Sequence, residues 1–420
     1  MQVGAATAGE SSVAGATTGE ATAADPTPTD PTPRPGLTRP DTSRPWRRAW
    51  QVGITTWVAA VITYVVVTAL SWMIDDEAGP PMQRLVQAWD RWDTGHYIRI
   101  AQFGYTPDRP DTHAFFPLFP MLLRGLDTIL PGPTLVASLV LSNVACIGAL
   151  VVLHRFTARE FDPATADRAL LFLMAWPAAF FLSAGYNGSL FLLLSVAALY
   201  CMRGGTWWAA GGLGALASAT RLTGVLLVLA FVVEYARQHG WRLRAIRFDA
   251  AAVLLVPVGL AAFSAYCWVT LGDPLAFSHA QDEWGRRFAP PWVGLAEAIQ
   301  AISVRPLLAQ STVHNLLDLV AVLATVGLLG LCVVGPWRLP RDQVFLLVYA
   351  AATLLVVLTG PVGGLFPMQG APRYALELIP IFLLLARLGA SRQFERLYLL
   401  PAVGLQVVLL LTFLNNVWVA

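Results

Sequence analysis

Residues Trp89–Pro120, WDRWDTGHYIRIAQFGYTPDRPDTHAFFPLFP, decide the interpretation of this chain. The stretch holds two Asp residues that each follow a Trp, two of the six histidines and many aromatic residues, in a chain of which only 13% is charged. It lies between two apolar segments that are long enough to cross a bilayer. We therefore expect a polar loop that carries the reactive site and is held in place by membrane spans.

Composition indicates a polytopic membrane protein. The 420 residues are 56% hydrophobic, and the mean hydropathy is +0.58, values typical of chains with several apolar spans. The net charge of +2 gives no indication of a nucleic-acid partner. The four cysteines lie far apart in apolar stretches, which favours buried free thiols over a disulfide or a metal site: Cys146, Cys201, Cys267 and Cys332.

The chain divides into a tail and one membrane domain. Residues 1–45 are rich in Ala, Thr, Gly and Pro, and such a segment buries too little apolar surface to fold, so we expect a disordered cytoplasmic tail. Residues 46–420 form an all-α domain of roughly 9–11 transmembrane helices with a large first outer loop, 73–133. Arg47 and Arg48 precede the first span and predict a cytoplasmic N-terminus.

Two apolar stretches are too long for single spans. Ala169–Met202 is interrupted at Tyr186-Asn187-Gly188, and Thr206–Tyr235 has Arg221 at its centre. We interpret each as a hairpin of two short spans, which places Tyr186 and Arg221 at the outer surface. The alternative, one long span with a buried Arg221, would put the arginines that follow Tyr235 outside, against the positive-inside rule. The remaining spans are predicted at about 50–72, 134–156, 250–271, 312–334, 343–359, 373–388 and 397–418.

Asp93 is the strongest candidate for a catalytic group. His96 and Tyr97 follow it by three and four residues and would share its face on a helix. A short amphipathic helix in the membrane interface would hold these groups. A carboxylate there can take the proton of a sugar hydroxyl. Asp90 has the same chemistry, and an Asp that merely caps the helix is the structural alternative.

Arginines on the expected outer side are candidates to bind a phosphate. The guanidinium fork matches phosphate oxygens, and Arg221, Arg286, Arg287 and Arg373 lie in outer turns or loops. For each, an ion pair with a neighbouring acid is the alternative: Arg373 with Glu377, or Arg286 with Asp282. Asp318 lies inside a span, where an acid is costly, although His314 one turn away would explain it.

The run RWDTGHYIRIAQFGY followed by AFFPLFP resembles the PIG-V mannosyltransferases, the GPI mannosyltransferase 2 enzymes and their bacterial relatives. The stretches WPAAFFLSAGYNGSLF, ATRLTG, GDPLAFSHAQDEWGR and PRYALELIPIFLLLA support the resemblance, which covers nearly everything after residue 45. The first motif is matched by Trp92, Asp93, His96, Tyr97, Ile100, Ala101, Gly104, Tyr105, Phe115, Phe116, Pro117 and Pro120. One departure is that relatives commonly carry an acid in Tyr-Ser-Glu-Ser-Leu, where this chain has Gly188.

The resemblance implies a GT-C fold and an inverting transferase that takes mannose from a polyprenyl-phosphate donor at the outer face of the plasma membrane. It leaves the acceptor open among a glycan, a glycolipid and a protein. We expect no cofactor and no obligatory metal. The expected catalytic residues are Asp93 and His96, and the expected substrate-binding residues are Arg91, Trp92, Tyr97, Tyr105, His113, Phe116, Tyr186, Arg221, Gln281, Trp284, Arg286 and Arg373. A lipid-linked glycan flippase or transporter is the alternative function, and a scaffold without catalysis is a third.

Overall fold

The structure is a computed structural model that describes residues 45–72 and 81–419. Nearly all of the predicted tail, 1–44, and the start of the first outer loop, 73–80, lie outside the described residues. Within the described part of the chain every named element is a helix, so the all-α prediction is confirmed. The cysteines there are free thiols, as predicted, and three of them are buried: Cys146, Cys267 and Cys332.

Five helices are long and apolar enough to cross a membrane. They are α1 (Pro45–Trp72), α5 (Thr134–Glu160), α13 (Gln310–Val333), α14 (Val344–Leu358) with the turn that precedes it, and α17 (Arg392–Leu414). A sixth is formed if η5 (Phe248–Leu255) and α10 (Val258–Leu271), bent by 42°, count as one span. The predicted 9–11 spans also include the short arms of the two hairpins and the segment 373–388, which are helices of 16 residues or fewer and therefore lie outside this count.

Both predicted interruptions are present. The first separates α6 (Pro163–Met174) from α7 (Gly188–Arg203) and contains η2 (Ala179–Leu182). The second separates α8 (Trp207–Ser218) from η3 (Leu222–Leu226) and α9 (Leu227–Gln238). The two breaks touch, because the Asn187 side-chain amide donates a hydrogen bond of 2.9 Å to the Thr220 carbonyl. Gly224 permits the second break, since a Cβ there would lie 2.4 Å from the Ala217 carbonyl carbon.

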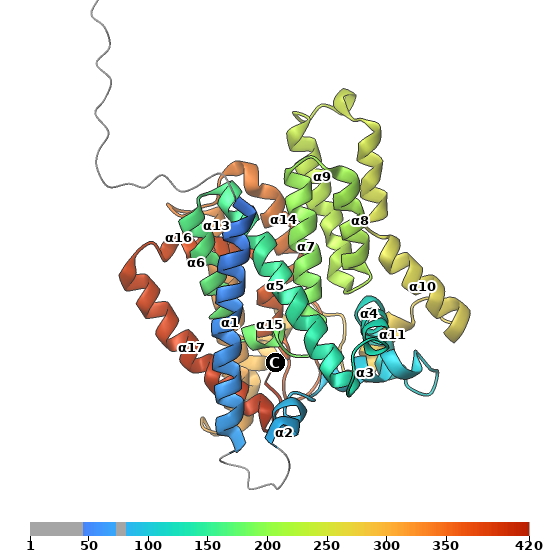
Figure 1. Ribbon diagram of the computed structural model, residues 1–420, viewed down its shortest axis with the longest axis vertical. Helices are drawn as coiled ribbons and strands as arrows, with labels where there is room; N and C mark the ends of the chain where they lie inside the picture. Colours follow the sequence, from blue (N-terminus) through green and yellow to red (C-terminus); the bar gives the residue numbers. More distant parts are fainter. Residues whose placement is uncertain (1–44, 73–80, 420) are drawn as a thin grey trace, which may run out of the picture. The chain divides into compact units, whose positions relative to one another are not determined.

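Short helices gather at one end of the long ones (Figure 1). From the first outer loop come α2 (Pro81–Gln87), α3 (Asp93–Phe103), η1 (Pro110–Ala114) and α4 (Leu118–Asp127). From the later loops come α11 (Ala276–Glu283), α12 (Val293–Ser303), α15 (Ala371–Tyr374) and η7 (Ala375–Glu377), after which α16 (Ile379–Leu388) continues the chain. The predicted short helix after Trp92 is therefore confirmed as α3.

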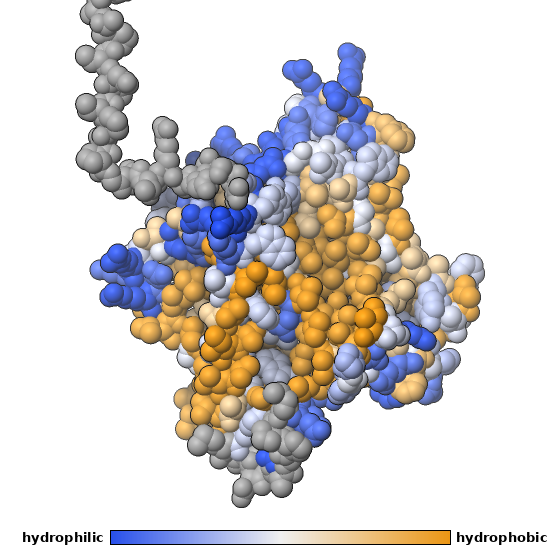
Figure 2. Space-filling view, viewed as in Figure 1, coloured by the Kyte–Doolittle hydropathy of each residue, from blue (hydrophilic) through white to orange (hydrophobic). Residues whose placement is uncertain are grey.

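The opposite end is basic and is tied together by ion pairs. Arg203 at the end of α7 pairs with Glu160, Glu234 and Asp342, which come from α5, α9 and the turn before α14. Beyond α9, η4 (Leu243–Ala245) and its flanks carry Arg242, Arg244 and Arg247. Figure 2 shows an apolar band between this hydrophilic end and the end that carries the short helices. Exposed apolar side chains of α1 contribute to the band: Ile54, Val58, Ile62, Val65, Val66 and Leu70.

Candidate active site

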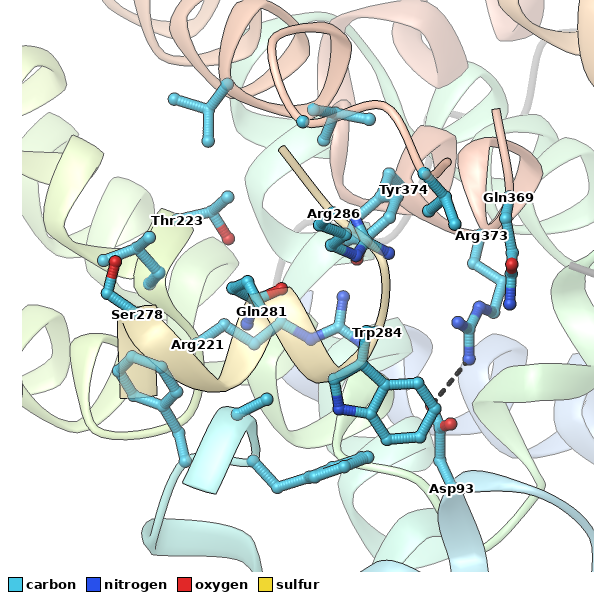
Figure 3. Close-up of a pocket in the computed structure, with 18 of the residues that line it drawn as sticks. Asp93, Arg221, Thr223, Ser278, Gln281, Trp284, Arg286, Gln369, Arg373 and Tyr374 are labelled. Atoms are coloured by element: carbon cyan, nitrogen blue, oxygen red, sulfur yellow. Dashed lines mark hydrogen bonds and ion pairs between the residues drawn. The ribbon is translucent and has the colours of Figure 1, made fainter. Parts of the chain in front are cut away.

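A cavity of about 640 Å³ opens among the short helices. Its walls come from parts of the chain that are far apart in sequence: the start of α3, the two helix breaks, α11 with the loop that follows it, and the loop between α14 and α15. Figure 3 shows the polar side chains of these segments turned toward one space. Eight of the predicted site residues line the cavity: Asp93, Tyr97, Phe116, Arg221, Gln281, Trp284, Arg286 and Arg373.

The start of α3 holds Asp93 at the cavity wall. Trp92 directly before it has a φ of 51°, a region that non-glycine residues seldom occupy. Its ring packs edge-on against Trp418, with centroids 4.7 Å apart. The Arg91 guanidinium donates to the Leu414 carbonyl at 2.9 and 3.1 Å. The end of α17 thus fixes the backbone just before Asp93, which gives Arg91 and Trp92 a positioning role rather than a place in the cavity.

Asp93 and Arg373 form an ion pair across the cavity wall, with 2.8 Å between Oδ2 and Nη1 (Figure 3). The Arg373 guanidinium also lies over the rings of Phe181, Tyr186 and Trp418, at 5.2–5.7 Å from their centroids. Aromatic faces stabilise a cation, so the charge of Arg373 is held in place. The predicted alternative, a pair between Arg373 and Glu377 at i+4, is wrong.

Glu377 pairs instead with Arg221. Arg221 further donates from Nε to the Asn187 side-chain oxygen at 3.0 Å. The two helix breaks and η7 are thereby joined beside the cavity, and Arg221 shares that cavity with Asp93, as the hairpin interpretation predicts. A Cβ at Gly188, the position where relatives commonly carry an acid, would lie 3.7 Å from Arg221 Nη2. In this chain Glu377 supplies a carboxylate to that guanidinium.

Arg286 enters the cavity because two loops pair with each other. Residue 286 forms an antiparallel bridge with Val362. Backbone hydrogen bonds extend the pairing: Gly363 N–H to the Gly285 carbonyl at 2.7 Å, Arg287 N–H to the Pro361 carbonyl at 3.1 Å, and Ala289 N–H to the Thr359 carbonyl at 3.0 Å. The pairing joins the loop after α11 to the loop before α15. Nothing in the local sequence of either loop indicates it.

Arg286 makes no ion pair with any residue in 45–72 or 81–419, so its predicted alternative, a pair with Asp282, is wrong. Arg287 beside it pairs with Glu297. The Arg286 guanidinium holds the pKa of the Tyr374 hydroxyl below its usual value, and both side chains line the cavity. Gly370, with a φ of 88°, lies close to both guanidinium groups: a Cβ there would lie 3.3 Å from Tyr374 Cε2, 3.5 Å from Arg373 Nη2 and 3.9 Å from Arg286 Nη2. The two guanidinium groups therefore converge over a position without a side chain.

One wall of the cavity is aromatic. Phe115, Phe116, Tyr97 and Trp284 line it, and the Trp284 indole N–H donates to the Asp111 carbonyl at 3.0 Å. His96 lies behind this wall, stacked on Phe115 at 4.8 Å between centroids and edge-on to Trp284 at 5.2 Å. Burial lowers the pKa of His96, so the imidazole is neutral near pH 7. These contacts suit a residue that positions the aromatic wall, and the catalytic role expected for His96 stays a prediction.

The other predicted site residues support the cavity from outside. The Tyr105 hydroxyl donates to the Phe115 carbonyl at 2.6 Å, and His113 Nε2 lies 3.0 Å from the Thr106 carbonyl. The Tyr186 hydroxyl donates to the Arg91 carbonyl at 3.2 Å. Asp318 lies 3.2 Å from His314 one turn away and does not line the cavity, so this pairing explains the acid inside a span.

Several cavity residues were not among the candidates from sequence. They are Asn187, Thr223, Ser278, Gln369, Tyr374 and Trp418. Four of them, Asn187, Thr223, Ser278 and Tyr374, lie within the stretches that carry the family resemblance, whereas Gln369 and Trp418 lie outside those stretches. In 45–72 and 81–419 no three His, Cys, Asp or Glu side chains are grouped so that they could hold a metal ion.

Comparison with known families identifies the chain. The family model described as Mannosyltransferase (PIG-V) matches residues 56–269, half of the chain. The chain belongs to the PIG-V mannosyltransferase family. The match includes α3, both helix breaks and therefore Asp93 and Arg221, but it ends before Arg286 and Arg373.

Curated relatives of this PIG-V family member match over a shorter stretch. The rat GPI alpha-1,6-mannosyltransferase 2 (Rattus norvegicus) is 34% identical over 157 residues, 35% of this chain and 32% of the relative. The human protein of the same name (Homo sapiens) is 32% identical over 157 residues, 35% of this chain and 31% of the relative. The chain thus spans about a third of the length of these relatives in alignment.

Two solved structures are similar at low identity. ArnT from Cupriavidus metallidurans bound to undecaprenyl phosphate has a TM-score of 0.49 and 15% identity, covering 84% of this chain and 63% of that one. The Archaeoglobus fulgidus oligosaccharyltransferase in its apo form has a TM-score of 0.42 and 14% identity, covering 88% of this chain and 56% of that one.

Proposed function

We propose that this PIG-V family member is a membrane mannosyltransferase that moves mannose from a polyprenyl-phosphate donor to an acceptor hydroxyl with inversion. The observation that carries the proposal is the cavity itself. It combines the carboxylates of Asp93 and Asp282 with four guanidinium groups, those of Arg221, Arg286, Arg287 and Arg373, and an aromatic wall. Sugar transfer from a lipid phosphate needs a base for the acceptor, cations for the leaving phosphate and flat surfaces for sugar rings.

One guanidinium group of the cavity is available to a donor phosphate. Arg221 pairs with Glu377, Arg373 with Asp93 and Arg287 with Glu297. Arg286 makes no ion pair within 45–72 and 81–419, and neither does Asp282, which also lines the cavity. A sugar linked through one phosphodiester carries one negative charge, which Arg286 would balance. Arg286 and Arg373 both line the cavity, and their Nη2 atoms converge near Gly370. One guanidinium group can donate two parallel hydrogen bonds to two oxygens of the same phosphate.

Asp93 is the base in this proposal. Its carboxylate takes the proton of the acceptor hydroxyl as that oxygen attacks the anomeric carbon. The bond between the anomeric carbon and the phosphate oxygen breaks, and the phosphate leaves with the electron pair. Inversion follows because the acceptor oxygen arrives on the face opposite the phosphate. No redox partner or metal enters this balance. Trp284 and Phe115 would hold the sugar rings, since aromatic faces pack well against their C–H surfaces.

The proposed location is the outer face of the plasma membrane. The arginine-rich end of the helices lies opposite the cavity end (Figures 1 and 2). The positive-inside rule assigns such an end to the cytoplasm and the cavity to the outer side, with the N-terminus inside. The lipid donor would then present its phosphate at the height of the short helices. A glycan, a glycolipid or a protein on the same side would be the acceptor.

A flippase or transporter of lipid-linked glycans is the alternative function. Such proteins place their substrate sites near the middle of the bilayer and alternate access between its two sides. Here the polar cavity residues come from loops and helix breaks near one end, which favours transfer over transport. A scaffold would not require carboxylates and four guanidinium groups around one cavity.

Reconstituted protein separates these functions. The assay supplies proteoliposomes with labelled polyprenyl-phosphate mannose and an extract of glycans and glycolipids from the outer face of the membrane. We expect a labelled product from the wild-type protein and none from Asp93→Asn. Movement of intact donor between leaflets without a labelled product would favour the transporter. Donor binding with neither outcome would favour the scaffold.

A further inference from the structure

The two terminal nitrogen atoms of Arg373 lie near two different parts of the proposed site, the base and the phosphate-binding group Arg286. Arg373 Nη1 lies 2.8 Å from Asp93 Oδ2, on the base. Its Nη2 lies 3.5 Å from the position that a Cβ would take at Gly370, and Arg286 Nη2 lies 3.9 Å from the same position. A planar guanidinium donates in two directions at once. One residue therefore lies between the group that accepts the proton and the place where the phosphate would bind.

The ion pair with Arg373 occupies the carboxylate that is proposed as the base. The Arg373 guanidinium donates from Nη1 to Asp93 Oδ2 at 2.8 Å, so this oxygen already has a cationic partner when no substrate is bound. Both side chains are largely buried, at 12% and 17% exposed, so solvent screens the interaction only in part. The protein without substrate thus has its base neutralised by the same residue that is available to a phosphate.

We propose that the donor phosphate and Asp93 compete for Arg373, so that donor binding frees the base. This inference rests on the proposed function. When the phosphate binds over Gly370, Arg373 turns from the carboxylate to the phosphate oxygens, and Asp93 is left to accept the proton of the acceptor hydroxyl. As the phosphate departs it gains a second negative charge, which Arg373 and Arg286 together balance. The protonated Asp93 no longer attracts Arg373.

The aromatic surroundings of Arg373 permit this exchange. The rings of Phe181, Tyr186 and Trp418 surround the guanidinium carbon at 5.2–5.7 Å. A ring face attracts the positive charge of the guanidinium itself. The rings therefore stabilise Arg373 equally when it contacts the Asp93 carboxylate and when it contacts a phosphate. The free base is thereby coupled to a bound donor, which would keep the enzyme from acting on an acceptor alone.

Equilibrium binding of a lipid phosphate tests the competition between Asp93 and the phosphate for Arg373, and the measurement does not require catalytic turnover. The probe is undecaprenyl phosphate, titrated into purified full-length protein in nanodiscs. Removing the competing carboxylate in Asp93→Asn should tighten binding about tenfold, because one charge-assisted contact of Arg373 becomes available to the phosphate. Asp90→Asn is the matched control: Asp90 is exposed and three residues away, and the affinity should stay unchanged. Unchanged or weaker binding by Asp93→Asn would overturn the proposal.

A double-mutant cycle distinguishes competition from simple repulsion between Asp93 and the phosphate. In an Arg373→Ala background, Asp93→Asn should no longer alter the affinity, since the shared cation is gone. A persistent gain in that background, or an equal gain from Asp90→Asn, would contradict the exchange. Wild-type protein that fails to bind undecaprenyl phosphate would overturn the donor assignment itself, and the exchange with it. Binding by the wild type with no effect of Asp93→Asn would overturn only the exchange. Thermal melting of each variant in the nanodisc verifies the fold.

Discussion

Arg286 lies directly opposite Val362 in an antiparallel bridge that joins the loop after α11 to the loop before α15. Three further backbone hydrogen bonds support the bridge. The pairing brings Arg286 next to Tyr374 and Arg373, although their segments are separated by α12, α13 and α14. The phosphate-binding part of the proposed site thus depends on contacts between loops rather than on any one motif.

Arg286→Ala should raise the KM for the donor about tenfold or more, because one charge-assisted hydrogen bond to a phosphate contributes about 1.5–3 kcal/mol. The measurement is donor-dependent initial velocity at saturating acceptor. Arg305→Ala removes an exposed arginine from the loop before α13 and should leave the donor KM unchanged. Equal effects of the two variants would mean that Arg286 acts only through the overall positive charge of the protein and not through a direct contact with the phosphate.

Asp93→Asn should lower kcat by a factor of about 10²–10⁴, the usual loss when a general base is removed. The amide keeps the size of the side chain, and α3 begins without a side-chain capping hydrogen bond that the substitution could remove, so the protein should remain folded, as shown by its melting temperature. Asp90→Asn should have a milder effect because Asp90 is exposed and lies outside the cavity. Near-normal turnover of Asp93→Asn together with an inactive Asp90→Asn would transfer the base to Asp90.

A cysteine at position 221 should react with an impermeant thiol reagent from the outer side of intact cells. Arg221 lines the cavity at the end opposite the arginine-rich segment around η4. Leu243→Cys, exposed in that segment, should react only after the cells are opened. Wild-type protein serves as the background control, since three of its four cysteines are buried. Labelling of Arg221→Cys from the cytoplasmic side alone would reverse the proposed orientation.

The stability of the protein should fall as the pH drops from 7.5 to 5.5, in part because of His96. Burial holds its pKa below the usual 6.5, so the unfolded chain binds a proton more readily than the folded one, and acid favours unfolding. Above pH 6.5 both states are neutral there and this contribution is fully present. His96→Gln should therefore show a smaller drop in melting temperature over that range. An unchanged drop would assign the pH dependence to other groups.

The sequence alone determined the class of the protein and one part of the site. Apolar runs of bilayer length and their flanking arginines predict a membrane bundle, because the bilayer allows few other structures. The break at Arg221 follows from the cost of a charge in the bilayer, and α3 follows from the spacing of Asp93, His96 and Tyr97. These features depend on residues that are close in sequence.

Only the tertiary structure decided which charges meet. Local spacing suggested the pairs Arg373–Glu377 and Arg286–Asp282 as alternatives to phosphate binding, whereas the structure pairs Arg373 with Asp93 and Arg221 with Glu377. The reason is physical: an ion pair forms where burial removes water and geometry brings opposite charges together, and neither is specified by separation along the chain. Arg286 has no acidic partner among the described residues because contacts between loops fix its position. Those contacts form because helices that lie far apart in sequence pack together.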